Sequence, residues 1–352
     1  VKTWGLFTNK NLGVWRKSRD YLNDATFFYS LWNGEYQYNH VTAIDGTISA
    51  GGGMEYPNIT VIGDAGNDFT LETVIMHEVG HNWFYGILGS NERDNAWMDE
   101  GLNSFNEDRY MDTKYPNAKL GAAIGAEGLD NRFRTKDFSQ RSLSELSYFL
   151  SAATNVDQPL QMNSDNFTGL NYGGIVYKKT AILFYYLKGY LGESLFDECM
   201  HTYYNEWKFK HPSPEDIEDV FERVSKQNLN WFFHDLIRTT KKIDFEIARV
   251  KKSGTGYQVK VKNVGQAEGG FSLGQEAGKT QWYSPIQPGK STWVQYENLD
   301  GNAIRIDAEG VIPEMNRGNN FIRTKGLFKK VEPLKMEFAI GIKNPKYTQM
   351  YY

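Results

Sequence analysis

The strongest chemical signal is an HExxH motif, in which His77 and His81 stand four residues apart and Glu78 follows the first histidine. The motif lies in a stretch whose apolar residues recur at helical spacing, namely Leu71, Val74, Ile75 and Val79. On a helix, residues i and i+4 share one face, so both imidazoles can reach one metal ion while Glu78 flanks it. This geometry suits zinc. Taken alone, the motif leaves a capping or core role for the two histidines open.

A catalytic zinc ion needs a third protein ligand and an open fourth position for water. Glu100 is the candidate, because it stands near the start of the next predicted helix, which follows a polar turn. If the two helices pack antiparallel, Glu100 faces His77 and His81. Glu107 recurs seven residues later and could orient a ligating histidine from behind; the alternative is an exposed glutamate on a helix.

This set of residues resembles the zinc signature of the M1 aminopeptidases, which belong to the thermolysin-like gluzincins. The resemblance includes the 18 residues between His81 and Glu100. It implies an α+β fold, in which a thermolysin-like catalytic domain with a small mixed sheet and a helical lobe precedes a small antiparallel β-sandwich. It further implies one zinc ion per chain, with Glu78 taking a proton from water and passing it to the leaving amine.

Two further segments match the family. Gly52-Gly53-Met54-Glu55-Tyr56 resembles its exopeptidase motif, and Tyr177 resembles its catalytic tyrosine. The resemblance implies that Gly52, Gly53, Met54 and Glu55 bind the substrate. Glycines let a peptide backbone lie against a strand edge, and Glu55 would pair with the free α-ammonium group. Tyr177 would donate a hydrogen bond to the developing oxyanion. The expected substrates are therefore peptides with a free N-terminus.

Other interpretations use the same residues. A relative that hydrolyses an epoxide or a narrow set of peptides would keep the same zinc ligands. A non-catalytic binding or scaffold protein could have inherited the fold, although the presence of both Glu78 and Tyr177 argues against it. Without the zinc motif, the glycine-rich segment would be a plain turn and Tyr177 a packed core residue.

Composition excludes several classes of protein. The 352 residues include 39 Lys and Arg against 43 Asp and Glu, a net charge of −4, which does not indicate nucleic-acid binding. No run of about 18 apolar residues is present, so no transmembrane segment is predicted. Cys199 is the single cysteine and is expected in the core. Export to the cell envelope is a hypothesis that rests only on the few cysteines and many aromatic residues.

The hydrophobic pattern divides the chain into three parts. Short strands are expected at 41–44 and 55–62, and helices at 14–32, 70–88, 96–110, 142–152, 174–191, 193–208, 214–226 and 228–239. From Phe245 the pattern changes to strand alternation. We therefore predict a catalytic domain at 1–240, with its helical lobe at about 115–240, a β-sandwich at 241–324 and a Lys-rich, truncated tail at 325–352. The histidines at 40, 201, 211 and 234 are expected to be structural or on the surface.

Overall fold

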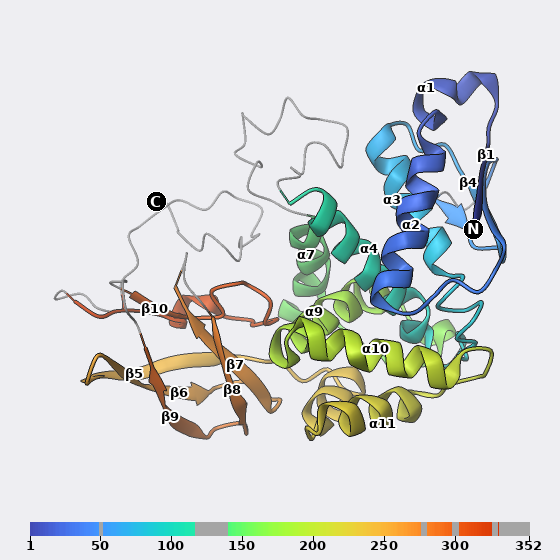
Figure 1. Cartoon of the computed structure of the whole chain (residues 1–352). Coiled ribbons are helices and arrows are strands. Elements are labelled where there is room, and N and C mark those ends of the chain that lie inside the picture. The colour runs from blue at the N-terminus through green and yellow to red at the C-terminus, as the bar shows by residue number, and fades with distance from the viewer. Residues whose placement is uncertain (49–51, 117–139, 276–279, 298–302, 326–329, 331–352) are drawn as a thin grey trace. The chain divides into compact units, whose positions relative to one another are not determined.

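The computed structural model describes residues 1–48, 52–116, 140–275, 280–297, 303–325 and 330. These residues group into two compact units (Figure 1). Unit 1 comprises 1–144, 160–181 and 193–227, and unit 2 comprises 145–159, 182–192 and 228–352. The units thus interleave along the chain, and the linear domain boundaries expected from the sequence stay a prediction. Nearly all of the Lys-rich tail lies outside the described residues.

Unit 1 contains a small mixed sheet. Its strand order is β1-β2-β4-β3, with β1 (Lys2–Leu6), β2 (His40–Asp45), β3 (Gly53–Met54) and β4 (Ile59–Ile62). The first three strands in this order run parallel, and β3 pairs antiparallel with β4. Buried Val41, Ala43 and Ile62 turn one face of the sheet toward the core. Because β3 stands last in the strand order, it is an edge strand of this sheet.

Unit 1 also contains helices. They include α1 (Leu12–Trp15), α2 (Ser18–Trp32), α3 (Asp68–Gly80), α4 (Glu100–Lys114), the π-helix η5 (Tyr172–Lys179), α10 (Glu193–Trp207) and α11 (Pro214–Ser225). Of these helices, α2 and α3 contact the sheet. α3 begins where the Asn67 side chain accepts a hydrogen bond from the amide of Thr70, and α11 begins with a capping box between Ser213 and Asp216. Short helical turns complete the unit: η1 (Asn9–Asn11), η2 (Ala96–Met98), η4 (Ser164–Asn166) and α8 (Gly169–Asn171).

The two predicted helices that carry the candidate site are wrong in extent. The helix expected at 70–88 ends at Gly80, because the chain then turns: Trp83 donates from its indole to the carbonyl of Gly34 at 2.7 Å, and Tyr85 has a φ of 103°. The helix expected at 96–110 is divided at Asp99, whose φ of −94° and ψ of −84° are not helical. As a result, α4 begins at Glu100 itself.

Unit 2 is built on two antiparallel sheets. One has the order β11-β10-β7-β8 and the other β5-β6-β9. Their strands are β5 (Phe245–Ser253), β6 (Gly256–Asn263), β7 (Gly269–Gly274), β8 (Gln281–Ile286), β9 (Ser291–Tyr296), β10 (Ala303–Ile306) and β11 (Phe321–Arg323). The sheets meet through apolar side chains such as Phe245 and Phe271, whose rings lie 5.8 Å apart. The strand alternation predicted from Phe245 onward is thus present.

Helices accompany these sheets in unit 2. They are the π-helix η6 (Trp231–Ile237) and parts of α7 (Gln140–Ala153) and α9 (Thr180–Leu191); both α7 and α9 also contribute residues to unit 1. The 3-10 turn η7 (Arg317–Asn319) precedes β11. Within the described parts of the chain, no helix is long and apolar enough to cross a bilayer.

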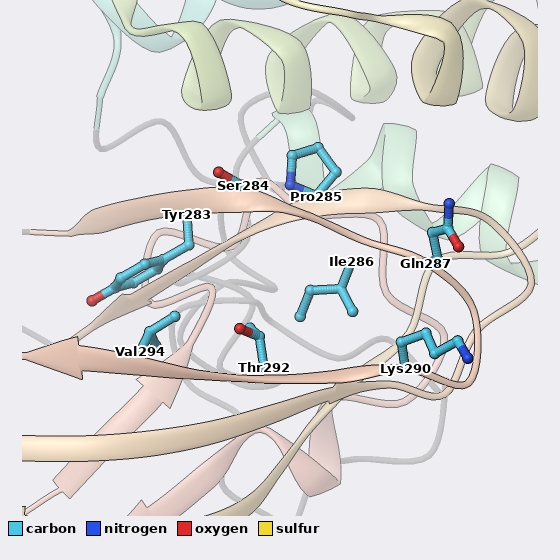
Figure 2. A pocket seen from close by; sticks show the side chains of 8 residues that line it. All are labelled: Tyr283, Ser284, Pro285, Ile286, Gln287, Lys290, Thr292 and Val294. Carbon is cyan, nitrogen blue, oxygen red and sulfur yellow. The ribbon is translucent and has the colours of Figure 1, made fainter.

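A pocket of about 370 Å³ opens between β8 and β9 of unit 2 (Figure 2). Tyr283, Pro285, Ile286, Thr292 and Val294 contribute to its lining. Its remaining lining residues are Ser284, Gln287 and Lys290, so it contains no carboxylate or histidine. This pocket therefore lacks the groups that metal-dependent hydrolysis requires.

Candidate metal centre and active site

The end of α3 and the start of α4 bring three ligand atoms together. His77 lies in the last turn of α3, His81 directly follows that helix, and Glu100 is the first residue of α4. The Nε2 atoms of the two histidines lie 3.3 Å apart, and Glu100 Oε2 lies 3.2 Å from His77 Nε2 and 3.3 Å from His81 Nε2. Buried Leu71, Ile75 and Val79 anchor α3 in the core and so fix where the two imidazoles project.

These separations fit a metal ion. Zinc bonds of about 2.0–2.1 Å in a tetrahedron place neighbouring ligand atoms about 3.3 Å from one another. The three measured separations, 3.2, 3.3 and 3.3 Å, agree with that value. Within the described ranges, His77, His81 and Glu100 form a group whose geometry could hold a metal ion. Three protein ligands leave a fourth position for water or substrate.

A carboxylate lies beside the Nδ1 atom of each histidine. His77 Nδ1 lies 2.9 Å from Glu107 Oε2, and His81 Nδ1 lies 2.7 Å from Asp99 Oδ1. Glu107 is buried and does not occupy the exposed helix face that was its alternative. Asp99 was not among the residues predicted from the sequence. A signal for it was available: each ligating histidine commonly has a carboxylate behind it, and Asp99 directly precedes the third ligand.

Carboxylates dominate the electrostatics of the site. Burial lowers the pKa of His77, but hydrogen bonds to Glu100 and Glu107 outweigh burial and raise this pKa to about 10. Burial is likewise outweighed at His81, where Asp99 and Glu100 raise the pKa well above its ordinary value. Burial favours the neutral form of Glu100, yet its hydrogen bonds to the two histidines lower its pKa. A metal ion must therefore displace protons from the imidazoles, so metal binding weakens as the pH falls.

Glu78 is a buried carboxylate with an unused oxygen. Its Oε2 accepts no hydrogen bond from the described residues. Burial raises the pKa of Glu78 to about 7, with a further increase from the charge of Glu55, while His77 and His81 oppose the rise. A buried acceptor without a donor costs about 1–3 kcal/mol, which is tolerated more readily where the group performs chemistry.

The glycine-rich segment lies directly against Glu78. A Cβ at Gly53 would lie 2.4 Å from Glu78 Cδ and Oε1, so any side chain at this position would displace the carboxylate. Gly52 has a φ of +70°, a left-handed conformation that side chains disfavour. Met54 is 39% exposed on β3, and Glu55 follows at the end of this strand. The structure thus places Gly53 against the predicted base, with Gly52, Met54 and Glu55 adjacent to it in the chain.

Tyr177 lies on η5 against the candidate metal ligands. Its ring stacks on His77 at 6.0 Å with an interplanar angle of 19°, and Tyr172 packs edge-on against it at 5.7 Å. Burial raises the pKa of Tyr177, as do the charge of Glu100 and a hydrogen bond with it, so the phenol keeps its proton. The sequence predicted an ordinary helix here; the observed π-helical turn is a feature often found at functional sites.

Aromatic residues and histidines outside the candidate site have other surroundings. Trp83 and Phe84, which follow the HExxH motif, are fully buried, whereas Tyr85 is partly exposed. His201 contacts the carbonyl of Leu31, His211 contacts the carbonyl of Gly89, and His234 contacts Arg238. Cys199 is buried, as predicted.

Metal-dependent hydrolases have sites of this kind, in which two histidines and a glutamate converge beside a buried carboxylate. The sequence model described as the Peptidase family M1 domain matches residues 23–236. The chain therefore belongs to peptidase family M1, in which zinc and the HExxH motif are typical.

Individual relatives point the same way. Leucine aminopeptidase 2-1 of Meyerozyma guilliermondii is 26% identical over 199 residues, which is 55% of this chain and 29% of that protein. Puromycin-sensitive aminopeptidase of Caenorhabditis elegans is 21% identical over 257 residues, 68% of this chain and 24% of that protein. The aligned parts of the chain thus span 24–29% of the length of these two relatives.

A solved structure shares the fold. The crystal structure of Legionella pneumophila aminopeptidase A in complex with aspartic acid aligns with a TM-score of 0.59 at 13% sequence identity. The alignment covers 88% of this chain and 36% of the other. The mixed helix and sheet architecture predicted from the sequence is therefore consistent with an aminopeptidase fold.

Proposed function

We propose that this protein is a zinc-dependent aminopeptidase, which removes N-terminal residues from peptides. The observation that carries the proposal is the convergence of His77, His81 and Glu100 at mutual distances of 3.2–3.3 Å beside the buried, unpaired carboxylate of Glu78. The aminopeptidase names of the relatives supply the reaction class.

Zinc, when bound by these three residues, would polarise a water molecule and the scissile carbonyl group. The role of Glu78 is to accept the proton of that water and to deliver it to the leaving amine. Burial raises the pKa of this carboxyl above its ordinary value, which favours the return of the proton to the leaving amine. The unused Oε2 leaves an acceptor free for the water proton.

Tyr177 is the proposed oxyanion donor. Its phenol remains protonated, because burial and the neighbouring Glu100 both raise its pKa. A single well-placed donor of this kind contributes about 3–4 kcal/mol to the stability of the transition state. The stacking of the ring on His77 holds the phenol next to the metal ligands.

The edge strand β3 is the proposed site of the substrate backbone. β3 pairs with β4 on one side, and a peptide could pair with its other side by strand addition. Glu55, at the end of this strand, would bind the α-ammonium group, and an acetylated terminus would leave that carboxylate unmatched. Gly52 and Met54 would lie along the peptide, and Gly53 keeps the strand in contact with Glu78.

We further propose the thermolysin-like layout for the catalytic part, with a catalytic domain at 1–240 and a β-sandwich at 241–324. Two arrangements support this layout: the small sheet and α3 carry the proposed site in unit 1, and two antiparallel sheets face each other in unit 2.

The test compares a free-amine tripeptide with its N-acetylated twin, both followed by mass spectrometry with the zinc-loaded chain. We expect the first residue to be removed only from the free peptide. Internal cleavage of both peptides would keep the metal chemistry and contradict the exopeptidase assignment. Zinc binding without cleavage of either peptide would favour a binding protein or a different substrate, such as an epoxide.

A further inference from the structure

One face of α4 holds His77 at three separate atoms. Glu100, Asn103 and Glu107 follow one another at spacings of three and four residues, so their side chains project from the same face of the helix. Glu100 Oε2 lies 3.2 Å from His77 Nε2, and Glu107 Oε2 lies 2.9 Å from Nδ1. Between them, Asn103 Nδ2 donates to the main-chain carbonyl of His77 at 2.7 Å. The first two contacts fix the ring, and the third fixes the backbone that carries it.

The carbonyl that Asn103 binds belongs to the last turn of α3, where helix carbonyls lack further main-chain donors. A side-chain amide from α4 supplies the donor. This hydrogen bond ties the end of α3, and with it both histidines of the HExxH motif, to the helix that begins with the third ligand. Because ligand atoms must lie within a few tenths of an ångström of ideal positions, a small shift of α3 along α4 would spoil the site.

The amide of Asn103 is itself fixed from the other side. Its Oδ1 accepts a hydrogen bond from Tyr29 of α2 at 2.5 Å, and the side chain is fully buried. Gly80, inside the HExxH motif, makes room for this contact: a Cβ there would lie 1.9 Å from Asn103 Oδ1 and 2.1 Å from the Tyr29 hydroxyl. The orientation of the amide, with its donor toward His77, therefore follows from three helices at once.

We propose that Asn103 is a positioning residue for the metal centre, which sets the register of α3 against α4 by holding the carbonyl of His77. This role deepens the proposed function and rests on the same three ligands. Asn103 should therefore control metal affinity through geometry, although its side chain is not a ligand.

Asn106 provides a matched control on the same helix. It is also fully buried, donates to the carbonyl of Leu102 at 2.9 Å and accepts from Asn33 at 3.0 Å. The first hydrogen bond lies within α4 and the second joins α4 to the residue that caps the end of α2, so neither reaches α3. Asn103→Ala and Asn106→Ala thus remove the same group from equally buried positions, and only the first removes a contact to a metal ligand.

The experiment measures zinc affinity by competition with a chelator, the visible spectrum of the Co²⁺-loaded protein, and urea unfolding of the metal-free protein. We expect both variants to lose stability, whereas only Asn103→Ala binds zinc about 10-fold or more weakly, with an altered Co²⁺ spectrum. Wild-type zinc affinity in Asn103→Ala, or an equal loss in Asn106→Ala, would overturn the proposal.

A second variant guards against failure of Asn103→Ala to fold. Gly80→Ala keeps the Asn103 side chain but forces its amide away from the Tyr29 hydroxyl, and we expect the same loss of zinc affinity. In the double variant no Asn103 amide is left for the added methyl group to displace, so the two losses of zinc affinity should not add. Additive losses would contradict the shared mechanism. If the wild-type chain binds no zinc, the proposed function fails as well; if it binds zinc and both single variants match it, only the positioning role fails.

Discussion

The two ends of α3 carry buried glutamates with opposite surroundings. Glu72, near the start of the helix, is 2% exposed and accepts hydrogen bonds from Tyr110, from Lys114 at 2.5 Å and from Tyr115 at 2.6 Å. Glu78, near the end, is 6% exposed, and its Oε2 accepts none from the described residues. Burial is therefore similar, and the supply of hydrogen-bond donors is what differs.

This difference separates a structural role from a chemical one. A carboxylate whose acceptors are filled by fixed donors ties elements together, as Glu72 ties α3 to the end of α4. A buried carboxylate with an open oxygen is available to a proton or a water molecule instead. Sequence periodicity places both residues on the same helix and does not distinguish them.

Replacing Glu78 should give the largest effect. We expect Glu78→Gln to lower kcat by about 10³-fold or more, because the amide cannot accept the proton of water, while zinc stays bound. Steady-state kinetics together with metal analysis would check this. Glu72→Gln is the matched control, for which we expect a lower urea midpoint and nearly normal kcat for the folded fraction. Equal losses of kcat in both variants would remove the proposed distinction between the two ends of α3.

Tyr177→Phe should have the next largest effect. It removes the phenolic donor and keeps the ring that stacks on His77. We expect kcat to fall about 10²–10³-fold with little change in KM, because the hydrogen bond forms mainly in the transition state. Tyr172→Phe, on the same π-helix, serves as the control and should retain most of the activity. A normal kcat in Tyr177→Phe would assign the tyrosine to packing alone.

Asp99→Asn tests the carboxylate that contacts Nδ1 of His81. Asp99 Oδ1 lies 2.7 Å from His81 Nδ1, so its loss should weaken zinc binding about 10–100-fold. Chelator competition measures this affinity directly. We expect Glu107→Gln to act similarly through His77. Unchanged affinity in both variants would show that the metal site does not depend on these carboxylates.

The pH dependence should show the smallest effect. The base works as the anion, so activity is lost as the pH falls through the pKa of Glu78. Burial raises this pKa from 4.5 to about 7 and a bound dication lowers it, so the acid limb of kcat/KM should lie below pH 7. Glu55→Gln removes a charge that raises the pKa, and the limb should move to lower pH. A limb that moves to higher pH in this variant would contradict the assignment.

The candidate ligand set and much of the secondary structure could be proposed from the sequence. Spacing of four residues on a helix fixes His77 and His81 on one face whatever the rest of the fold does, because helix geometry is local. For the same reason the apolar periodicity of α3 and the strand alternation of β5 were readable from the chain.

The ends of these elements and the surroundings of the ligands depend instead on long-range packing. α3 stops at Gly80 because the indole of Trp83 reaches a carbonyl far away in sequence, at Gly34. Asn103 and Tyr29 meet His77 only after three helices have packed together. Hydrogen bonds between residues 26 or 74 positions apart depend on the packing of whole elements, which no local spacing encodes.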